Sequence, residues 1–371
     1  MTGPSSHPLL GVIANPVSAR DIRRIVANAG NLQITDRVNI VLRVLQAARA
    51  AGVARALLMP DRGGIRALLE RHLRRGDDSL PAVEWLDFQP SSSVEDSFTA
   101  TRQLQAAGAA AIVVLGGDGT HRAVVRELVR ESMHEPPSNC PALPIAGLST
   151  GTNNAFPEMR EPTITGLAAG LFAAGRISAA EALAPNKLLE VLIHPRDGAP
   201  PRRDIAIVDV VITHDRSVGA RALWKTGSLA AAYLAFAEPE AIGLSSIGGL
   251  LQPVGRRERG GLAVQLAADP LHTLLTLHAP IAPGLVLPVP VASWQRLAAD
   301  EPVTVLQSAG TVALDGEREL AFEAGDRVTV TLRENAFFTI DVARCMAAAA
   351  RDGLLRSPPP GAAAQAPVPP R

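Results

Sequence analysis

Residues 110–126 read AAIVVLGGDGTHRAVVR, and this stretch decides the fold that we expect for the whole chain. The apolar run from Ala110 to Leu115 predicts a buried strand, and the glycine-rich turn at 116–120 separates it from residues compatible with a helix. Glycine has no Cβ, so backbone N–H groups in such a turn can close on a phosphate. Asp118 lies inside the turn, and its charge would repel a phosphate unless the carboxylate holds a metal ion or accepts a proton.

A second glycine-containing turn follows a later apolar run, at residues 143–147. This turn consists of Gly151, Thr152, Asn153 and Asn154. An earlier apolar run, at residues 9–14, stops at Asn15 because the proline that follows ends the strand. Open α/β sheets bind their ligands at the carboxyl ends of strands. We therefore expect ligand binding at Asn15 and at both glycine turns.

Strand and helix patterns alternate through the first half of the chain, which predicts a parallel sheet with crossover helices. We expect strands at 9–14, 53–59, 83–88, 110–115 and 143–147, and helices at 36–51, 65–75, 94–107 and 164–174. Short runs punctuated by proline and glycine predict antiparallel strands. These runs lie at 187–193, 205–213, 262–266, 271–278, 303–307, 311–314 and 327–332. A helical interruption at 219–237 is ambiguous.

The fold class that we expect is α/β, with an N-terminal parallel-sheet, Rossmann-like domain and a C-terminal antiparallel β-sandwich domain. Residues 1–185 would form the nucleotide- or phosphate-binding domain, and residues 186–345 the β-rich substrate domain. Residues 346–371 would form a tail, rich in proline and alanine and disordered from about residue 357.

Composition narrows the class of protein. Of the 371 residues, 47% are hydrophobic and 19% are charged, which is an ordinary globular balance. The formal net charge is zero, so we expect neither a nucleic-acid partner nor an acidic membrane partner. Two cysteines are too few for a disulfide framework. Since no run approaches the roughly 20 apolar residues of a membrane helix, and the N-terminus lacks a basic signal region, we expect a cytoplasmic protein.

With both turns placed, the chain resembles the NAD kinase and diacylglycerol kinase superfamily. The GGDGT turn at 116–120 is similar to its hallmark, and residues 151–154 are similar to its GTGN-type loop. Residues 208–212 (VDVVI) resemble the short Asn-Glu segment of NAD kinases, with Asp209 at the acid. More narrowly, residues 13–16, 20–24 and 149–157 look like the acetoin-catabolism X proteins, a subfamily of the predicted ATP–NAD kinases. The resemblance covers most of residues 9–345.

The resemblance implies an ATP-dependent phosphotransferase that phosphorylates a hydroxyl group, with the 2′-hydroxyl of NAD as one candidate and acetoin catabolism as one context. ATP or polyphosphate would be the donor, and Asp118 would be the catalytic base or would hold Mg²⁺. The implied nucleotide- and phosphate-binding residues are Asn15, Gly116, Gly117, Gly119, Thr120, Gly151, Thr152, Asn153 and Asn154. A cleft between the two domains would hold donor and acceptor, and a homodimer or homotetramer is implied.

The chain departs from NAD kinases at two places that concern the acceptor. Val208 stands where their segment has Asn, which removes an amide expected to touch the dinucleotide. Their Thr-Gly-Ser turn has no clean match. Residues 226–228 have the sequence TGS but lie too close to Asp209 in the chain, whereas residues 245–249 (SSIGG) lie at a better position but differ in sequence. The substrate-binding residues that we expect are therefore Asp209, Ser245, Ser246 and Gly248. These departures leave open a lipid or small-metabolite kinase, and also a non-catalytic nucleotide-binding accessory protein.

Each candidate also has a purely structural reading. Asp118 could cap the next helix, although that helix is expected to start after Thr120, which could bind phosphate or act as the cap itself. Asn153 and Asn154 tolerate left-handed turn conformations without any ligand. Asp209 could make a structural hydrogen bond at the domain junction. Asp315-Gly316 is a strong signal for a type I′ hairpin. The arginines that could bind phosphate or form a solvated basic face are Arg20, Arg23 and Arg24.

Overall fold

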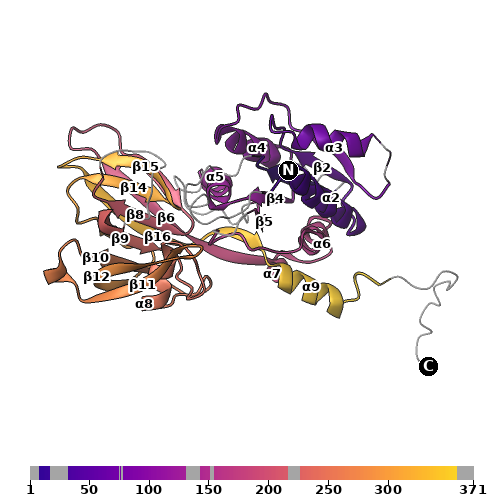
Figure 1. Ribbon diagram of the computed structural model, residues 1–371. Coiled ribbons are helices and arrows are strands. Elements are labelled where there is room, and N and C mark those ends of the chain that lie inside the picture. Colours follow the sequence, from indigo (N-terminus) through magenta and orange to yellow (C-terminus); the bar gives the residue numbers. More distant parts are fainter. Residues whose placement is uncertain are drawn as a thin grey trace.

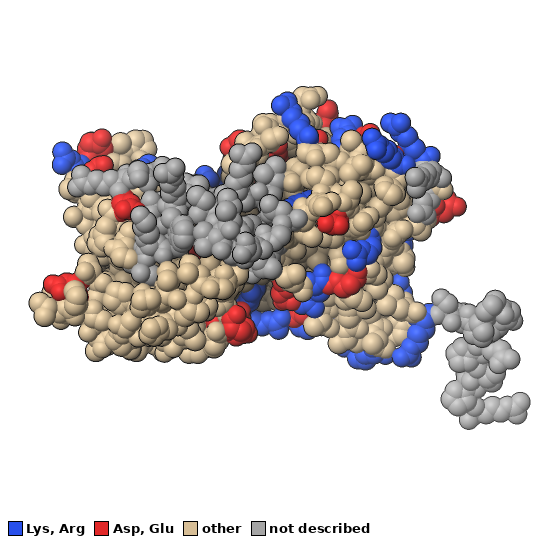
Figure 2. Space-filling model, viewed as in Figure 1, with Lys and Arg blue, Asp and Glu red and all other residues tan. Residues whose placement is uncertain are grey.

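The computed structural model describes residues 8–16, 32–74, 76, 78–130, 143–150, 154–215 and 226–356. It has two halves, one with helices around a parallel sheet and one built of antiparallel strands (Figure 1). The predicted arginine cluster at 20–24, the turn residues 151–153 and the tail from 357 lie outside the described residues. Charges of both signs are scattered over the face shown in Figure 2, as expected for a chain with zero net charge.

The first sheet begins as a parallel sheet. Its strands run in the order β3-β2-β1-β4-β5, and they are β1 (Leu9–Ala14), β2 (Arg55–Leu58), β3 (Ala82–Trp85), β4 (Ala111–Gly116) and β5 (Ile145–Ser149). The helices of this half are α2 (Ile34–Ala50), α3 (Ile65–Leu73), α4 (Glu95–Ala106), α5 (Asp118–Val129) and α6 (Pro162–Ala173). Every residue of β1 and β4 is buried. A parallel sheet covered on both faces requires such continuous apolar strands.

The same sheet continues into the other half of the molecule. Long strands carry it beyond β5, in the order β16-β6-β7, and β13 pairs with β16. Their bounds are β6 (Leu183–His194), β7 (Arg202–Ala206), β13 (Pro302–Thr304) and β16 (Arg327–Ile340). β16 is parallel to β5 and antiparallel to β6, so the sheet changes from parallel to antiparallel at this point.

The second sheet is antiparallel throughout, with the order β11-β12-β10-β9-β8-β14-β15. Its strands are β8 (Asp209–Thr213), β9 (Leu229–Leu234), β10 (Gly261–Leu266), β11 (Leu275–Ala282), β12 (Leu285–Leu297), β14 (Gly310–Leu314) and β15 (Glu317–Phe322). Apolar residues of β6, β7 and β16 share one core with those of β8, β9 and β14, which makes this half a sandwich. The predicted fold class is therefore confirmed.

Several local predictions need correction. Residues 229–234 of the ambiguous interruption form strand β9, after the 3₁₀ turn η1 (Thr226–Ser228). The run predicted at 205–213 is two strands, β7 and β8. The run predicted at 271–278 begins instead at Leu275, because η2 (Pro270–His272) precedes it. Helices α7 (Ala179–Ala182) and α8 (Ser245–Leu251), and strands β12 and β15, were not predicted.

The predicted hairpin at Asp315-Gly316 is confirmed. The two residues have φ values of 49° and 87°, and the flanking Leu314 and Glu317 pair across β14 and β15. Positive φ at both central positions defines a type I′ turn. Among the described residues, no helix is both long and apolar enough to cross a membrane.

The predicted domain limits fall inside regular elements. The limit after residue 185 lies within β6, which runs unbroken from one half to the other. The limit after residue 345 lies within α9 (Val342–Arg351), which packs against α6 in the N-terminal half. Small apolar residues at helical spacing, including Cys345, Ala348 and Ala349, place this helix in that core. Residues of β1 and of α9 thus share one core.

Candidate functional site

The GGDGT turn lies between β4 and α5. The helix begins at Asp118, three residues before the expected start, with Gly117 as its N-cap residue in an extended conformation. A Cβ at Gly116 would lie 2.6 Å from Cβ of Thr120, and one at Gly117 would lie 2.9 Å from Oδ1 of Asn154. Both glycines are therefore needed for the close approach of neighbouring side chains.

Asp118 connects the first glycine turn to the residues that follow the second one. Its Oδ2 accepts the backbone N–H of Ala155 at 2.9 Å, and its Oδ1 accepts that of Phe156 at 2.9 Å. An ionised carboxylate, which only accepts hydrogen bonds, suits this pair of donors. Both of these donors lie outside the helix that Asp118 begins, so the carboxylate connects α5 to the segment after β5.

The other described residues of the predicted site surround this connection. Asn15 Nδ2 donates to Oγ1 of Thr120 at 3.0 Å, which ties the end of β1 to the first turn of α5. Asn154 Nδ2 donates to Oγ of Ser149 at 2.7 Å, at the end of β5. The ends of three adjacent strands, β1, β4 and β5, therefore meet at Asp118, as expected for the ligand-binding edge of an α/β sheet. Gly119 lies in the first turn of α5.

His121 packs beneath the turn. Its Nδ1 lies 2.9 Å from the carbonyl oxygen of Gly117, and its ring centroid lies 5.8 Å from that of Phe156. The imidazole is fully buried, and this burial lowers the pKa of His121 to about 4. Burial disfavours the charged form because a low-dielectric interior solvates an imidazolium poorly. The imidazole of His121 is therefore uncharged at neutral pH, and it supports the turn by packing against it.

This burial makes the stability of the turn depend on pH. The unfolded chain binds a proton at His121 near pH 6.5, whereas the folded chain binds it only near pH 4. Between these values the unfolded state binds more protons, so acid favours unfolding by about 3 kcal/mol in total from this residue. Urea unfolding at pH 6.5 and pH 4 should show this loss for wild type and not for His121→Asn. Equal losses in both proteins would contradict the assignment.

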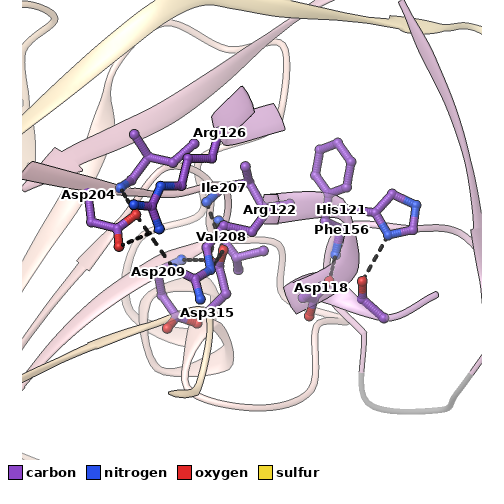
Figure 3. A network of polar contacts seen from close by, with 12 residues as sticks. Asp118, His121, Arg122, Arg126, Phe156, Asp204, Ile207, Val208, Asp209 and Asp315 are labelled. Carbon is purple, nitrogen blue, oxygen red and sulfur yellow. Dashed lines mark hydrogen bonds and ion pairs between the residues drawn. The ribbon is translucent and has the colours of Figure 1, made fainter. Parts of the chain in front are cut away.

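A second polar network anchors α5 to the antiparallel half (Figure 3). Arg126 Nη1 donates to Oδ2 of Asp204 at 3.2 Å, and Arg122 Nη1 lies 3.8 Å from Oδ1 of the same residue. Arg122 Nε lies 3.8 Å from Oδ2 of Asp315. Asp315 and Arg122 are both buried, so this helix, which starts at Asp118, is attached to β7 and to the β14–β15 hairpin.

Asp315 does more than shape its hairpin. Its carboxyl group accepts the backbone N–H groups of Ile207, Val208 and Asp209 at 3.0, 2.8 and 3.1 Å. Burial raises the pKa of Asp315 to about 8, Arg122 opposes this rise, and the charges of Asp209 and Asp118 add to it. The charge of Asp118 is thus one of the smaller influences on the Asp315 carboxyl group.

Val208 and Asp209, at the start of β8, are both buried. Val208 is 1% exposed, and its side chain belongs to the shared sandwich core. Asp209 is also buried, and its carbonyl oxygen accepts the N–H of Asp315 at 2.9 Å. A core valine cannot supply the amide that the family pattern places here. The role of Asp209 in substrate binding stays a prediction.

The remaining predicted substrate residues lie in α8, which packs on the second sheet. Ser245 and Ser246 are buried, and the Ser246 hydroxyl donates to the carbonyl oxygen of Gly243 at 2.6 Å. A Cβ at Gly248 would lie 2.2 Å from a methyl group of Leu234. These contacts belong to the core that α8 shares with the second sheet, so substrate binding by α8 stays a prediction.

Gly248→Ala is expected to act on packing. The added methyl group also meets Ala237 and Leu262 at 3.0 Å, so we expect a loss of about 2 kcal/mol in the free energy of unfolding. Gly227→Ala, at a glycine with open space around it, should be close to neutral. Urea unfolding of both variants measures the difference. A Gly248→Ala protein that is as stable as wild type but has a raised KM for its substrate would instead support the role in binding.

Three side chains that support the candidate site were not predicted from the sequence. Arg122 is one helical turn after Asp118, and its buried position on the amphipathic helix was the available signal. Asp315 was visible only as a hairpin residue. Arg256 contacts the backbone of Ala155 and Phe156 across about a hundred residues of sequence, so local pattern carries no signal for it.

Comparison with known proteins agrees with the two-part construction. Residues 24–177 match the model of the ATP-NAD kinase N-terminal domain, and residues 187–335 match that of the acetoin catabolism protein X C-terminal domain. Among solved structures, yeast NADH kinase complexed with NADH has a TM-score of 0.46 and 12% identity, covering 91% of this chain and 84% of that chain. A putative diacylglycerol kinase from Bacillus anthracis str. Sterne has a TM-score of 0.42 and 14% identity, covering 91% and 98%.

One curated relative covers nearly the whole chain. The chain is 61% identical over 359 residues to acetoin catabolism protein X from Cupriavidus necator, which is 96% of each protein. Identity at this level and coverage confirms the resemblance inferred from the two glycine turns. The chain therefore belongs to the acetoin catabolism protein X family.

Proposed function

We propose that this protein is a phosphotransferase of the NAD kinase type, which transfers the terminal phosphoryl group of ATP to a hydroxyl group. The match of residues 24–177 to the ATP-NAD kinase N-terminal domain supports this reaction class. The observation that carries the proposal is the placement of Asp118. Its carboxylate lies where three strand ends meet and is held by the N–H groups of Ala155 and Phe156, which follow the second turn. Such a pre-oriented carboxylate suits a general base.

The proposed step conserves atoms and electrons. The acceptor hydroxyl oxygen forms a bond to the γ-phosphorus, while the bond from that phosphorus to the bridging oxygen of ATP breaks. The bridging oxygen leaves with the electron pair as part of ADP, and the hydroxyl proton passes to Asp118. Residues 116–120 and 151–154 and Asn15 would hold the phosphates and the nucleotide. Polyphosphate is the alternative donor.

Mg²⁺ fits this arrangement as a companion of the nucleotide. Within the described residues, no group of three or more His, Cys, Asp or Glu side chains could hold a metal ion. Mg²⁺ in kinase sites commonly uses one or two carboxylates together with phosphates and water. Asp118 would hold it in the alternative in which this carboxylate does not act as the base. When bound, the ion would neutralise charge on the phosphate oxygens.

The phosphate acceptor has two candidates. The 2′-hydroxyl of NAD is the first candidate, but the buried Val208 removes the amide expected beside a dinucleotide. A lipid or a small hydroxylated metabolite, such as the acetoin in the name of the relative, is therefore the second candidate. Mass spectrometry after incubation with Mg²⁺ and ATP or polyphosphate would identify the phosphorylated acceptor. Binding of ATP and NAD in calorimetry, with no phosphorylated product from any acceptor, would favour a non-catalytic accessory protein.

We also infer the setting in which the protein works. The zero net charge supports a protein that acts on nucleotides and small molecules rather than on nucleic acid or an acidic membrane, and we propose a cytoplasmic location. By analogy with similar folds, we propose a homodimer or homotetramer. Light scattering after size-exclusion chromatography would determine the mass of the particle.

A further inference from the structure

Arg256 lies in the loop between α8 and β10 and reaches the turn that holds Asp118. Its Nη1 donates to the carbonyl oxygen of Phe156 at 2.6 Å, and its Nη2 donates to that of Ala155. Its Nε donates to Glu238 at 3.1 Å. Each guanidinium nitrogen thus has a partner, and two of these partners belong to the segment after β5.

The peptide group between Ala155 and Phe156 joins Arg256 to Asp118. Its carbonyl oxygen accepts from the guanidinium, and its N–H donates to Asp118 Oδ1. The described chain has no cis peptide bond, and a trans peptide points its C=O and N–H to opposite sides. The cation and the carboxylate therefore face each other across one planar amide. They polarise it in the same direction, which strengthens both hydrogen bonds.

The position of the guanidinium is fixed by the antiparallel half. It lies over the ring of Phe236 at 4.6 Å and near that of Phe156 at 5.7 Å. The loop itself is held by Lys187 of β6, whose Nζ donates to three carbonyl oxygens at 3.1, 2.7 and 2.8 Å. These carbonyls belong to Gly255, Glu258 and Gly260.

We propose that Arg256 is a positioning residue for Asp118, through which the antiparallel half sets the orientation of the carboxylate. Arg256 acts through the peptide between Ala155 and Phe156 and touches no reacting atom. The catalytic consequence rests on the proposed phosphotransfer, whereas the linkage itself is a property of the fold. The two parts have separate tests.

The catalytic test compares Arg256→Gln with Arg259→Gln, an arginine of the same loop whose side chain is 92% exposed. Arg256→Gln should lower kcat by about 10- to 100-fold with little change in KM for ATP, because Asp118 loses its fixed orientation. Arg256→Lys keeps the charge but replaces the planar guanidinium, whose two terminal nitrogens bond the two carbonyls separately, with a single donor atom, and should be intermediate. A raised KM with unchanged kcat would overturn the positioning role.

The structural test needs no activity. Urea midpoints of wild type, Asp118→Asn, Arg256→Gln and the double variant form a double-mutant cycle. We expect the midpoint loss caused by Arg256→Gln to be at least halved when Asp118 is already replaced, and Arg256→Lys provides a milder replacement for the same cycle. Additive losses would overturn the linkage. If wild type phosphorylates nothing, the proposed function fails, and this cycle still decides whether Arg256 and Asp118 are linked.

Discussion

Asp118→Asn is expected to lower kcat for phosphoryl transfer by about 10³-fold, because the amide cannot accept the proton of the acceptor hydroxyl. In the wild type the carboxylate accepts hydrogen bonds from two backbone N–H groups of the turn after β5. The amide oxygen of asparagine can still accept one of them. The fold should therefore persist, and circular dichroism would show this. Steady-state kinetics with the acceptor identified by mass spectrometry would measure the loss.

Asp61→Asn is a matched control for this variant. Asp61 follows β2 as Asp118 follows β4, and its carboxylate likewise accepts two backbone N–H groups, from Ile65 at 3.1 Å and Arg66 at 2.7 Å. Its replacement should cost a similar pair of charge-assisted hydrogen bonds and leave kcat close to the wild-type value. Equal losses of activity in the two variants would mean that Asp118 contributes only structure.

Lys187→Met is expected to lower the free energy of unfolding by about 3 kcal/mol. The ammonium group is buried and binds three backbone carbonyls of the loop at 255–260, which methionine cannot bind. Burial lowers the pKa of Lys187 to about 8, so the charged form still predominates at pH 7. Urea unfolding at pH 7 measures the loss. Phosphotransfer should fall as well, because the same loop carries Arg256.

Arg296→Gln separates the buried contacts from surface contacts to the same loop. Arg296 donates to Glu258 and to the carbonyl of Arg259, but its side chain is partly exposed. Exposed ion pairs contribute about 1 kcal/mol or less. If Arg296→Gln is as destabilising as Lys187→Met, the loop is not held chiefly from β6.

The strands of the parallel half could be predicted because burial on both faces makes their sequences continuously apolar. The runs LLGVIA and AIVVLG are covered on both faces, so each is continuously apolar and matches β1 and β4 closely. Strand β12 was missed because Pro288 and Pro290 interrupt its pattern. In the structure both prolines pair with β11, and pairing with β10 starts only at Val291. Proline is tolerated there because that part of β12 has a partner on one side.

The candidate site was predictable at its centre and not at its periphery. Spacing after strands identified Asp118, Thr120 and Asn15, because the ends of parallel strands meet at one edge. The sequence could not show that Asp315 caps the start of β8 or that Arg256 holds Ala155 and Phe156. Both contacts join residues about a hundred positions apart and depend on how the sheets pack. The helix start was misplaced because Asp118, Gly119 and Thr120 were assigned to the turn, whereas all three lie in α5.

A crystal structure of the full chain with NAD, Mg²⁺ and a non-hydrolysable ATP analogue would test the central claim most directly. We predict that the terminal phosphate lies against residues 116–120. The acceptor hydroxyl oxygen should lie about 3 Å from a carboxylate oxygen of Asp118, which is the reach of a general base. Nucleotide bound away from the ends of β4 and β5, with Asp118 contacting only Ala155 and Phe156, would contradict the account.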